Sequence, residues 1–284
     1  MQRKMNLKTL AALLGLSLCA AAAQAGTFEA LDCGEFKTHV YSSGDVMGNT
    51  SLIVEGKEGL VLMELPLFKE NMAEFSDYAA KLGKPAVRVI TDYHEGAVAG
   101  VPGLMPQGMP AFVKGETYSG MMAHFREKFG DKLVDLPEAQ VEEAPFGGAV
   151  ELAGVPFRFE KGPASDFPAA NILIGGKVFY SHWAPAKAHM NPLQLDSVAA
   201  IDAELESARA ALAAQEAGAK YFVGGHGGLA GEGAVAFRAA YLETVKKLRG
   251  EHKTAEAFAE ALKKAYPDLP GAEGVEKMAG ALYK

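Results

Sequence analysis

Thr91-Asp92-Tyr93-His94-Glu95-Gly96-Ala97 is the most informative stretch of this chain. It follows directly on residues 86–90, a short run rich in valine and isoleucine that is typical of a buried strand. Loops at strand ends carry catalytic and metal-binding side chains more often than other segments do, because such side chains are free to converge there. The stretch therefore predicts a functional site at the end of this strand.

Three further loops place an imidazole or a carboxylate beside a predicted strand. The first precedes the strand 171–174, the second ends the strand 177–180, and the third follows the strand 221–223. Their sequences are Gly162-Pro163-Ala164-Ser165-Asp166-Phe167-Pro168, Phe179-Tyr180-Ser181-His182-Trp183 and Gly224-Gly225-His226-Gly227-Gly228. The four loops together offer five oxygen or nitrogen donors, which are Asp92, His94, Asp166, His182 and His226.

Strands and helices are mixed throughout the chain. Glycine-containing turns predict strand pairs, such as residues 171–174 with residues 177–180. No long linker and no fixed repeat interrupts the pattern, so we expect residues 26–284 to form a single domain. Apolar residues at spacings of three and four predict helices, over residues 69–82, 116–129 and 197–218.

The order of these elements and the four loops resemble the metallo-β-lactamase superfamily. The resemblance begins at Gly48-Asn49-Thr50-Ser51-Leu52-Ile53, continues through Leu62-Met63-Glu64-Leu65 and ends at Gly225-His226-Gly227. It covers nearly all of the chain after residue 26. It implies an α/β fold, a four-layer αββα sandwich of the metallo-β-lactamase type, with metal ligands on loops at one edge of two sheets.

The first metal-binding motif departs from the family pattern. Where the family reads T-H-x-H-x-D-H, Asp92 stands at the first histidine and His94 at the second. Gly96 and Ala97 replace the Asp-His pair that would hold a second metal. The family usually ends the preceding strand with an Asp that supports the metal loop, and here that position holds Glu64.

The later motifs are also altered, except for the last. The family's H-T-P turn corresponds to Asp166-Phe167-Pro168, so an Asp stands where a His would be. The G-D step that supplies a bridging carboxylate corresponds to Ser181-His182. The closing G-H-G around His226 is intact.

Two interpretations of these departures are open. In the first, the five donors form a rewritten metal site, because Asp and His both bind Zn²⁺ or Fe²⁺; Asp92 is then a ligand or, alternatively, the general base beside the metal. In the second, the site has decayed and binds no metal. The first interpretation implies a single divalent ion, zinc before iron, held by His94 and His226 with at least one of Asp92, Asp166 and His182.

Enzymes of the superfamily that this sequence resembles use a metal-bound hydroxide, because the metal lowers the pKa of its bound water towards 7. The resemblance thus implies hydrolysis of a small ester, lactone or amide. Two-metal phosphodiester cleavage is disfavoured, since Gly96 and Ala97 supply no ligand. A non-catalytic exported binding protein that keeps the fold is the alternative, and a metal-carrying or redox protein is a third.

The amino terminus has the pattern of a secretory signal peptide. Basic residues lie within residues 1–8, an apolar run covers about residues 10–23, and Ala23-Gln24-Ala25 precedes Gly26. The apolar run is too short for a stable membrane span. A lipoprotein anchor at Cys19 is disfavoured, because Leu18 stands where a small residue is needed. We therefore expect a periplasmic or secreted protein without stable membrane insertion.

The net charge argues against a nucleic-acid partner, and the cysteine content argues against a disulfide. The 284 residues carry 28 Lys and Arg against 35 Asp and Glu, a net charge of −7, which becomes −10 without residues 1–25. Such an acidic chain repels phosphate backbones, so a small molecule is expected as partner and nucleic acid is not. Removal of the signal leaves Cys33 alone, so no intramolecular disulfide can form.

The mature protein is expected to begin at Gly26. Intact-mass measurement of the protein exported by a bacterium should give the mass of residues 26–284. A species that retains Cys19 with added lipid mass would contradict this cleavage site.

Overall fold

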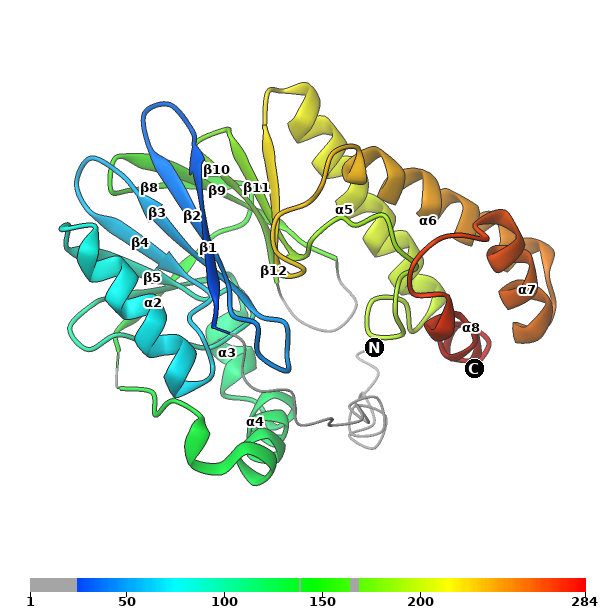
Figure 1. Ribbon diagram of the computed structural model, residues 1–284, viewed down its shortest axis with the longest axis horizontal. Coiled ribbons are helices and arrows are strands. Elements are labelled where there is room, and N and C mark those ends of the chain that lie inside the picture. Colours follow the sequence, from blue (N-terminus) through cyan, green and yellow to red (C-terminus); the bar gives the residue numbers. More distant parts are fainter. Residues whose placement is uncertain (1–24, 138, 164–168) are drawn as a thin grey trace.

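The computed structural model describes residues 25–137, 139–163 and 169–284. Within them the chain forms two β-sheets that face each other (Figure 1). The first sheet contains seven strands in sequence order. They are β1 (Thr27–Asp32), β2 (Lys37–Ser42), β3 (Thr50–Glu55), β4 (Leu60–Met63), β5 (Ala86–Ile90), β6 (Gly103–Pro106) and β7 (Val141–Ala144).

The second sheet contains five strands in the order β12-β11-β10-β9-β8. They are β8 (Gly148–Leu152), β9 (Val155–Lys161), β10 (Ala170–Ile174), β11 (Val178–Trp183) and β12 (Tyr221–His226). In the first sheet, neighbouring strands from β1 to β4 pair antiparallel and those from β4 to β7 pair parallel. In the second sheet, neighbouring strands from β8 to β11 pair antiparallel, and β11 pairs parallel with β12. Parallel neighbours end at the same edge of a sheet, and this edge carries the candidate site.

Helices cover the outer faces of both sheets. The α-helices are α2 (Lys69–Lys81), α3 (Met109–Val113), α4 (Glu116–Phe129), α5 (Val198–Glu216), α6 (Ala234–Glu251), α7 (Ala255–Ala265) and α8 (Val275–Leu282). Short 3₁₀ turns lie at η1 (Gly130–Lys132) and η2 (Ala272–Gly274). The last three helices extend beyond the sheets at one end of the molecule (Figure 1).

Alternating side chains build the layers. In β9, Val155, Phe157 and Phe159 are buried in the core between the sheets, while Arg158 is exposed, as the two-residue period of a strand requires. In β3, Leu52 faces the same core and Ile53 faces the layer that contains Phe75 of α2.

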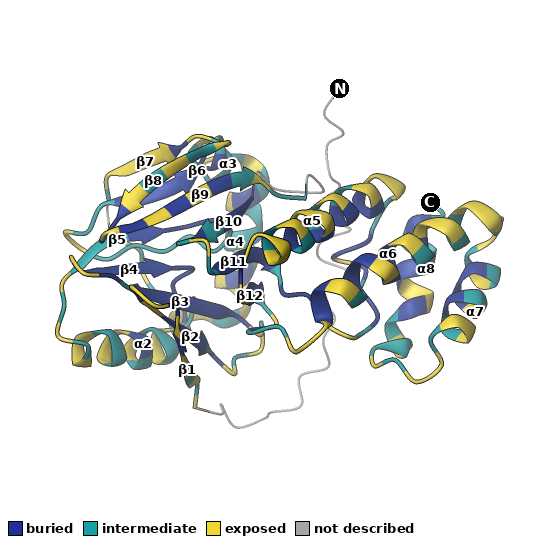
Figure 2. Ribbon diagram, turned by 90° about the horizontal axis from the view of Figure 1, so that it is seen from above, coloured by how far each residue is buried: buried dark blue, intermediate teal, exposed yellow. Residues whose placement is uncertain are grey.

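Helix α5 packs against the outer face of the second sheet, where its residue Ala211 contacts the cluster of Phe179 and Phe222. The order of layers is therefore α2, first sheet, second sheet, α5, which is the predicted αββα sandwich. Figure 2 shows the strands largely buried and the helices exposed along their outer sides.

The structure extends two of the predicted strands. Strand β11 continues to Trp183 and β12 to His226, where the sequence indicated loops from residues 181 and 224 onward. The parallel ladder between them causes the extension, because it pairs Ser181 with Gly224 and Trp183 with His226. His182 and His226 are consequently held by strand backbone.

The expected first residue of the mature chain makes a specific contact. The backbone nitrogen of Gly26 donates to Glu74 Oε2 at 3.0 Å, and the Tyr41 hydroxyl donates to the same oxygen at 2.6 Å. A Cβ at position 26 would lie 2.3 Å from the Tyr41 ring, so only glycine fits here. Cleavage before Gly26 would replace the amide with an ammonium group and convert this hydrogen bond into an ion pair.

Glu74→Gln should therefore destabilise a chain that begins at Gly26 more than one that retains Ala25. The glutamine keeps a hydrogen-bond acceptor and removes only the charge, so we expect an extra fall in melting temperature of about 1–3 °C for the chain with the free Gly26 ammonium. Thermal unfolding of both chains, the one that begins at Gly26 and the one that retains Ala25, each with and without Glu74→Gln, tests this. Equal effects of the substitution on both chains would show that the terminal charge contributes nothing.

Candidate metal centre

Three histidines converge at one edge of the two sheets. His94 lies in the loop after β5, His182 lies in β11, and His226 ends β12. One ligand atom from each lies within 4.8 Å of the other two. The Nε2 atoms of His94 and His226 are 3.2 Å apart, and the centroids of the His182 and His226 rings are 4.9 Å apart. Side chains from both sheets thus form one group of nitrogen donors.

Strand pairing brings these histidines together. Strands β11 and β12 are parallel neighbours, so His182 and His226 reach the same edge. The backbone nitrogen of Ala184 donates to His226 O at 2.9 Å, and an isolated β-bridge joins His226 to Asn49, the residue directly before β3 of the first sheet. The end of β12 is therefore tied to both sheets, and its side chain has little freedom.

A buried carboxylate, Glu64, holds the loop that carries His94. Glu64 is 1% exposed and lies directly after β4 with φ of 53°, a strained value for a residue other than glycine. Its carboxylate accepts hydrogen bonds from the amides of Asp92, Tyr93 and His94, at 2.5, 3.1 and 3.0 Å. The ring Nδ1 of His94 lies 3.1 Å from Glu64 Oε2. This contact leaves Nε2 of His94 facing the other histidines.

The charge state of Glu64 fits this role. Burial alone would raise its pKa, but the contact with the His94 ring, together with the backbone amides of Asp92 and Tyr93, holds the pKa below its usual value. The carboxylate is therefore ionised at neutral pH and fixes the orientation of the His94 ring. A carboxylate behind a histidine is the usual arrangement that orients an imidazole ligand and strengthens it.

Two of the imidazoles are neutral. Burial, followed by the nearby His226 and His94, lowers the pKa of His182 well below its usual value. Burial and then His94 lower the pKa of His226 to about 3. The buried Nδ1 of His182 has no hydrogen-bond partner in the described part of the chain. A neutral imidazole can donate a nitrogen lone pair to a divalent metal, so this set of donors fits such an ion.

The other two predicted site residues, Asp92 and Asp166, are not among these three donors. Asp92 is fully buried, and its Oδ1 accepts a hydrogen bond from Ala170 N at 2.6 Å. Burial and the nearby Glu64 charge raise the pKa of Asp92 well above its usual value. The group of converging donors does not include Asp92, whose roles as ligand and general base stay predictions. Asp166 falls outside the described residues, and its role also stays a prediction.

Aromatic rings pack against two of the histidines. The Tyr93 ring stacks on His182 with centroids 3.4 Å apart, and the Trp183 ring stacks on His226 at 4.6 Å. No pattern in the sequence pointed to a role for Tyr93. Its position beside His94 was the only signal, since the partner of its ring is far away in the chain.

The structure also explains why Gly96 stands where the resemblance places an Asp ligand. A Cβ at position 96 would lie 2.6 Å from Cβ of Leu65, a residue that is only 3% exposed. Any side chain at position 96 would therefore displace Leu65. Position 96 therefore has neither a donor nor room for one.

Solved metallo-β-lactamases superimpose on most of this chain. The DIM-1 metallo-β-lactamase matches with a TM-score of 0.53 and 14% identity, covering 78% of this chain and 98% of its own. FIM-1 from Pseudomonas aeruginosa, in its mono-zinc form, matches with a TM-score of 0.51 and 18% identity, covering 80% of this chain and 98% of its own. The chain has the metallo-β-lactamase fold. The fold expected from the sequence is thereby confirmed.

A larger protein shares this metallo-β-lactamase fold. The stereoselective inverting sec-alkylsulfatase Pisa1 from Pseudomonas sp. matches with a TM-score of 0.56 and 16% identity over 90% of this chain. The chain spans about half the length of that sulfatase, since the match covers 50% of it. Neither a protein-family model nor a curated protein matches the chain. Among the described residues, no helix has the length and apolar character that a membrane crossing requires.

The purified protein is expected to bind one zinc ion per chain after incubation with zinc and removal of the excess. His182→Ala and His226→Ala should each lose this ion, because each removes one of three nitrogen ligands. His124→Ala is the matched control, since His124 lies on α4 with a partly exposed side chain. Elemental analysis by mass spectrometry gives the stoichiometry. Two ions per chain, or full binding by His226→Ala, would contradict a single site.

Glu64→Gln should weaken zinc binding about 10–100-fold, because it removes the charge behind His94 while keeping the side chain's size. Competition with a chromogenic chelator measures the affinity. Glu58→Gln, an exposed position in the β3–β4 turn, is the control and should bind zinc as the unaltered protein does. An unchanged affinity in Glu64→Gln would show that the carboxylate has only a structural role.

Proposed function

We propose that this chain is an exported hydrolase that uses a single metal-activated water on a small ester, lactone or amide. The observation that carries the proposal is the convergence of His94, His182 and His226, with Glu64 behind His94. Three imidazole nitrogens around one ion leave a fourth position open, which is typical of catalytic rather than structural zinc sites.

Each residue has a defined part in this proposal. His94, His182 and His226 would hold the ion, zinc before iron, and the ion would supply a water that ionises near neutral pH. Glu64 keeps the His94 ring in the orientation that directs Nε2 at the group. The rings of Tyr93 and Trp183 restrict rotation of His182 and His226. Asp92 remains a candidate general base or further ligand.

Solved structures with this fold include proteins named as a sulfatase and as β-lactamases, which supports hydrolysis as the class of reaction. The closed space at Gly96 supports a single-ion site, so substrates that need two metals are disfavoured. The amino-terminal pattern supports export to the periplasm or the medium, and the net negative charge supports a small-molecule substrate over nucleic acid.

A non-catalytic binding protein is the second candidate. The 3.2 Å separation of Nε2 in His94 from Nε2 in His226 is also that of a direct hydrogen bond between two imidazoles. In a metal-free protein this bond would satisfy both nitrogens, and the group would then have a structural role.

Hydrolysis assays on the zinc-loaded protein separate the two candidates. We expect turnover of at least one of p-nitrophenyl acetate, γ-butyrolactone and a chromogenic β-lactam, with no turnover of bis(p-nitrophenyl) phosphate. His182→Ala and prior chelation should each abolish turnover, and His124→Ala should retain it. No turnover of any of the first three substrates would reject the hydrolase and favour the binding protein.

A further inference from the structure

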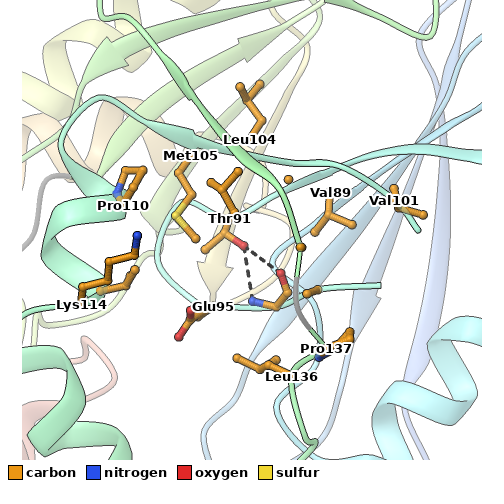
Figure 3. A pocket seen from close by; sticks show the side chains of 16 residues that line it. Val89, Thr91, Glu95, Val101, Leu104, Met105, Pro110, Lys114, Leu136 and Pro137 are labelled. Atoms are coloured by element: carbon orange, nitrogen blue, oxygen red, sulfur yellow. Dashed lines mark hydrogen bonds between the residues drawn. The ribbon is translucent and has the colours of Figure 1, made fainter. Parts of the chain in front are cut away.

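A second candidate site lies beside the loop that carries His94. It is a cavity of about 410 Å³ between this loop, strands β5 and β6, the end of α3, and the lining residues Leu136, Pro137, Ala139 and Val141 (Figure 3). None of the three histidines lines it. Its volume is within the range of small-molecule sites, about 300–1,000 Å³.

Small residues keep this cavity open. Gly96 and Ala97, which stand where the resemblance places a metal-binding Asp-His pair, both line it, as does Gly103 of β6. A longer side chain at Ala97 would occupy the space, and a Cβ at Gly103 would lie 3.1 Å from Val141, another lining residue. Buried Val89 and Leu104 form apolar wall, so the interior favours a hydrocarbon chain.

The polar groups of the cavity gather on one side. In Figure 3, Glu95 and Lys114 lie together at one side, across from Val89 and Val101. The Thr91 hydroxyl is already engaged with backbone N and O of Gly96, both at 3.4 Å. Among the described residues, the Glu95 carboxylate has no close ion-pair partner, although the charge of Arg126 acts on it, and the Lys114 ammonium likewise has no close partner. Both are therefore available to a ligand.

We propose that this cavity binds a small uncharged amphiphile, an aliphatic primary amide or alcohol. Its hydrocarbon chain would lie along Val89, Val101 and Leu104. Its head would donate a hydrogen bond to Glu95 and accept one from Lys114, which a carboxylate or an ammonium head cannot do without facing a like charge. The proposal is independent of the proposed hydrolase, because it uses none of the metal-binding residues.

Three probes with the same chain and different heads test it: hexanamide, hexanoate and hexylammonium. Titration into ¹⁵N-labelled protein should move the amide signals of Gly96 and Gly103, with a dissociation constant for hexanamide on the order of a millimolar. We expect hexanamide to bind at least about threefold more tightly than either charged probe. Equal binding of all three probes, tighter binding of a charged probe, or no binding would each overturn the proposal.

Two variants show whether the named residues are responsible. Glu95→Gln removes the repulsion of hexanoate and should tighten hexanoate binding about tenfold relative to the unaltered protein. Ala97→Phe should abolish hexanamide binding by filling the cavity, whereas Val46→Phe, at an exposed position, should leave it unchanged. The ¹⁵N spectrum of each variant reports its folding. Unchanged hexanoate binding in Glu95→Gln would overturn the assignment of the head group.

Discussion

The buried Glu64 carboxylate is the interaction on which the arrangement of the site depends. It lies under the loop after β5 and accepts hydrogen bonds from three consecutive amides, while its second oxygen faces the His94 ring. A buried carboxylate is stable only when its oxygens are satisfied, so the loop and the carboxylate require each other. The strained φ of Glu64 is the local cost of this arrangement, and the hydrogen bonds offset it.

The second constraint is the parallel pairing of β11 with β12. This pairing carries His182 and His226 to the same edge, where the facing sheet supplies His94. Because two of the three imidazoles are held by strand backbone, the geometry of the group is set by the sandwich itself. Such a site tolerates changes in the surrounding loops more easily than one built on loops alone.

The small residues at positions 96 and 97 have two consequences. Leu65 occupies the space that a longer side chain at position 96 would need, so the position implied for a second metal is closed. The neighbouring Ala97, with only a methyl group, leaves the 410 Å³ cavity open. The replacement of the family's Asp-His pair by Gly96 and Ala97 thus leaves a compact group of histidines on the one hand and an apolar cavity that none of them lines on the other.

The strands beside the site loops and the longer helices were readable from the sequence, because periodicity and turn residues are local signals. Short elements such as β6, β7 and α3 were not. The same local signals marked His94, His182 and His226 as candidates. The pairing of β11 with β12 to its last residue, the bond between Asp92 and Ala170, and the contact of Leu65 with Gly96 were not readable. Each joins residues that are distant in the chain, and a local pattern carries no information about which distant backbone or side chain will pack against it.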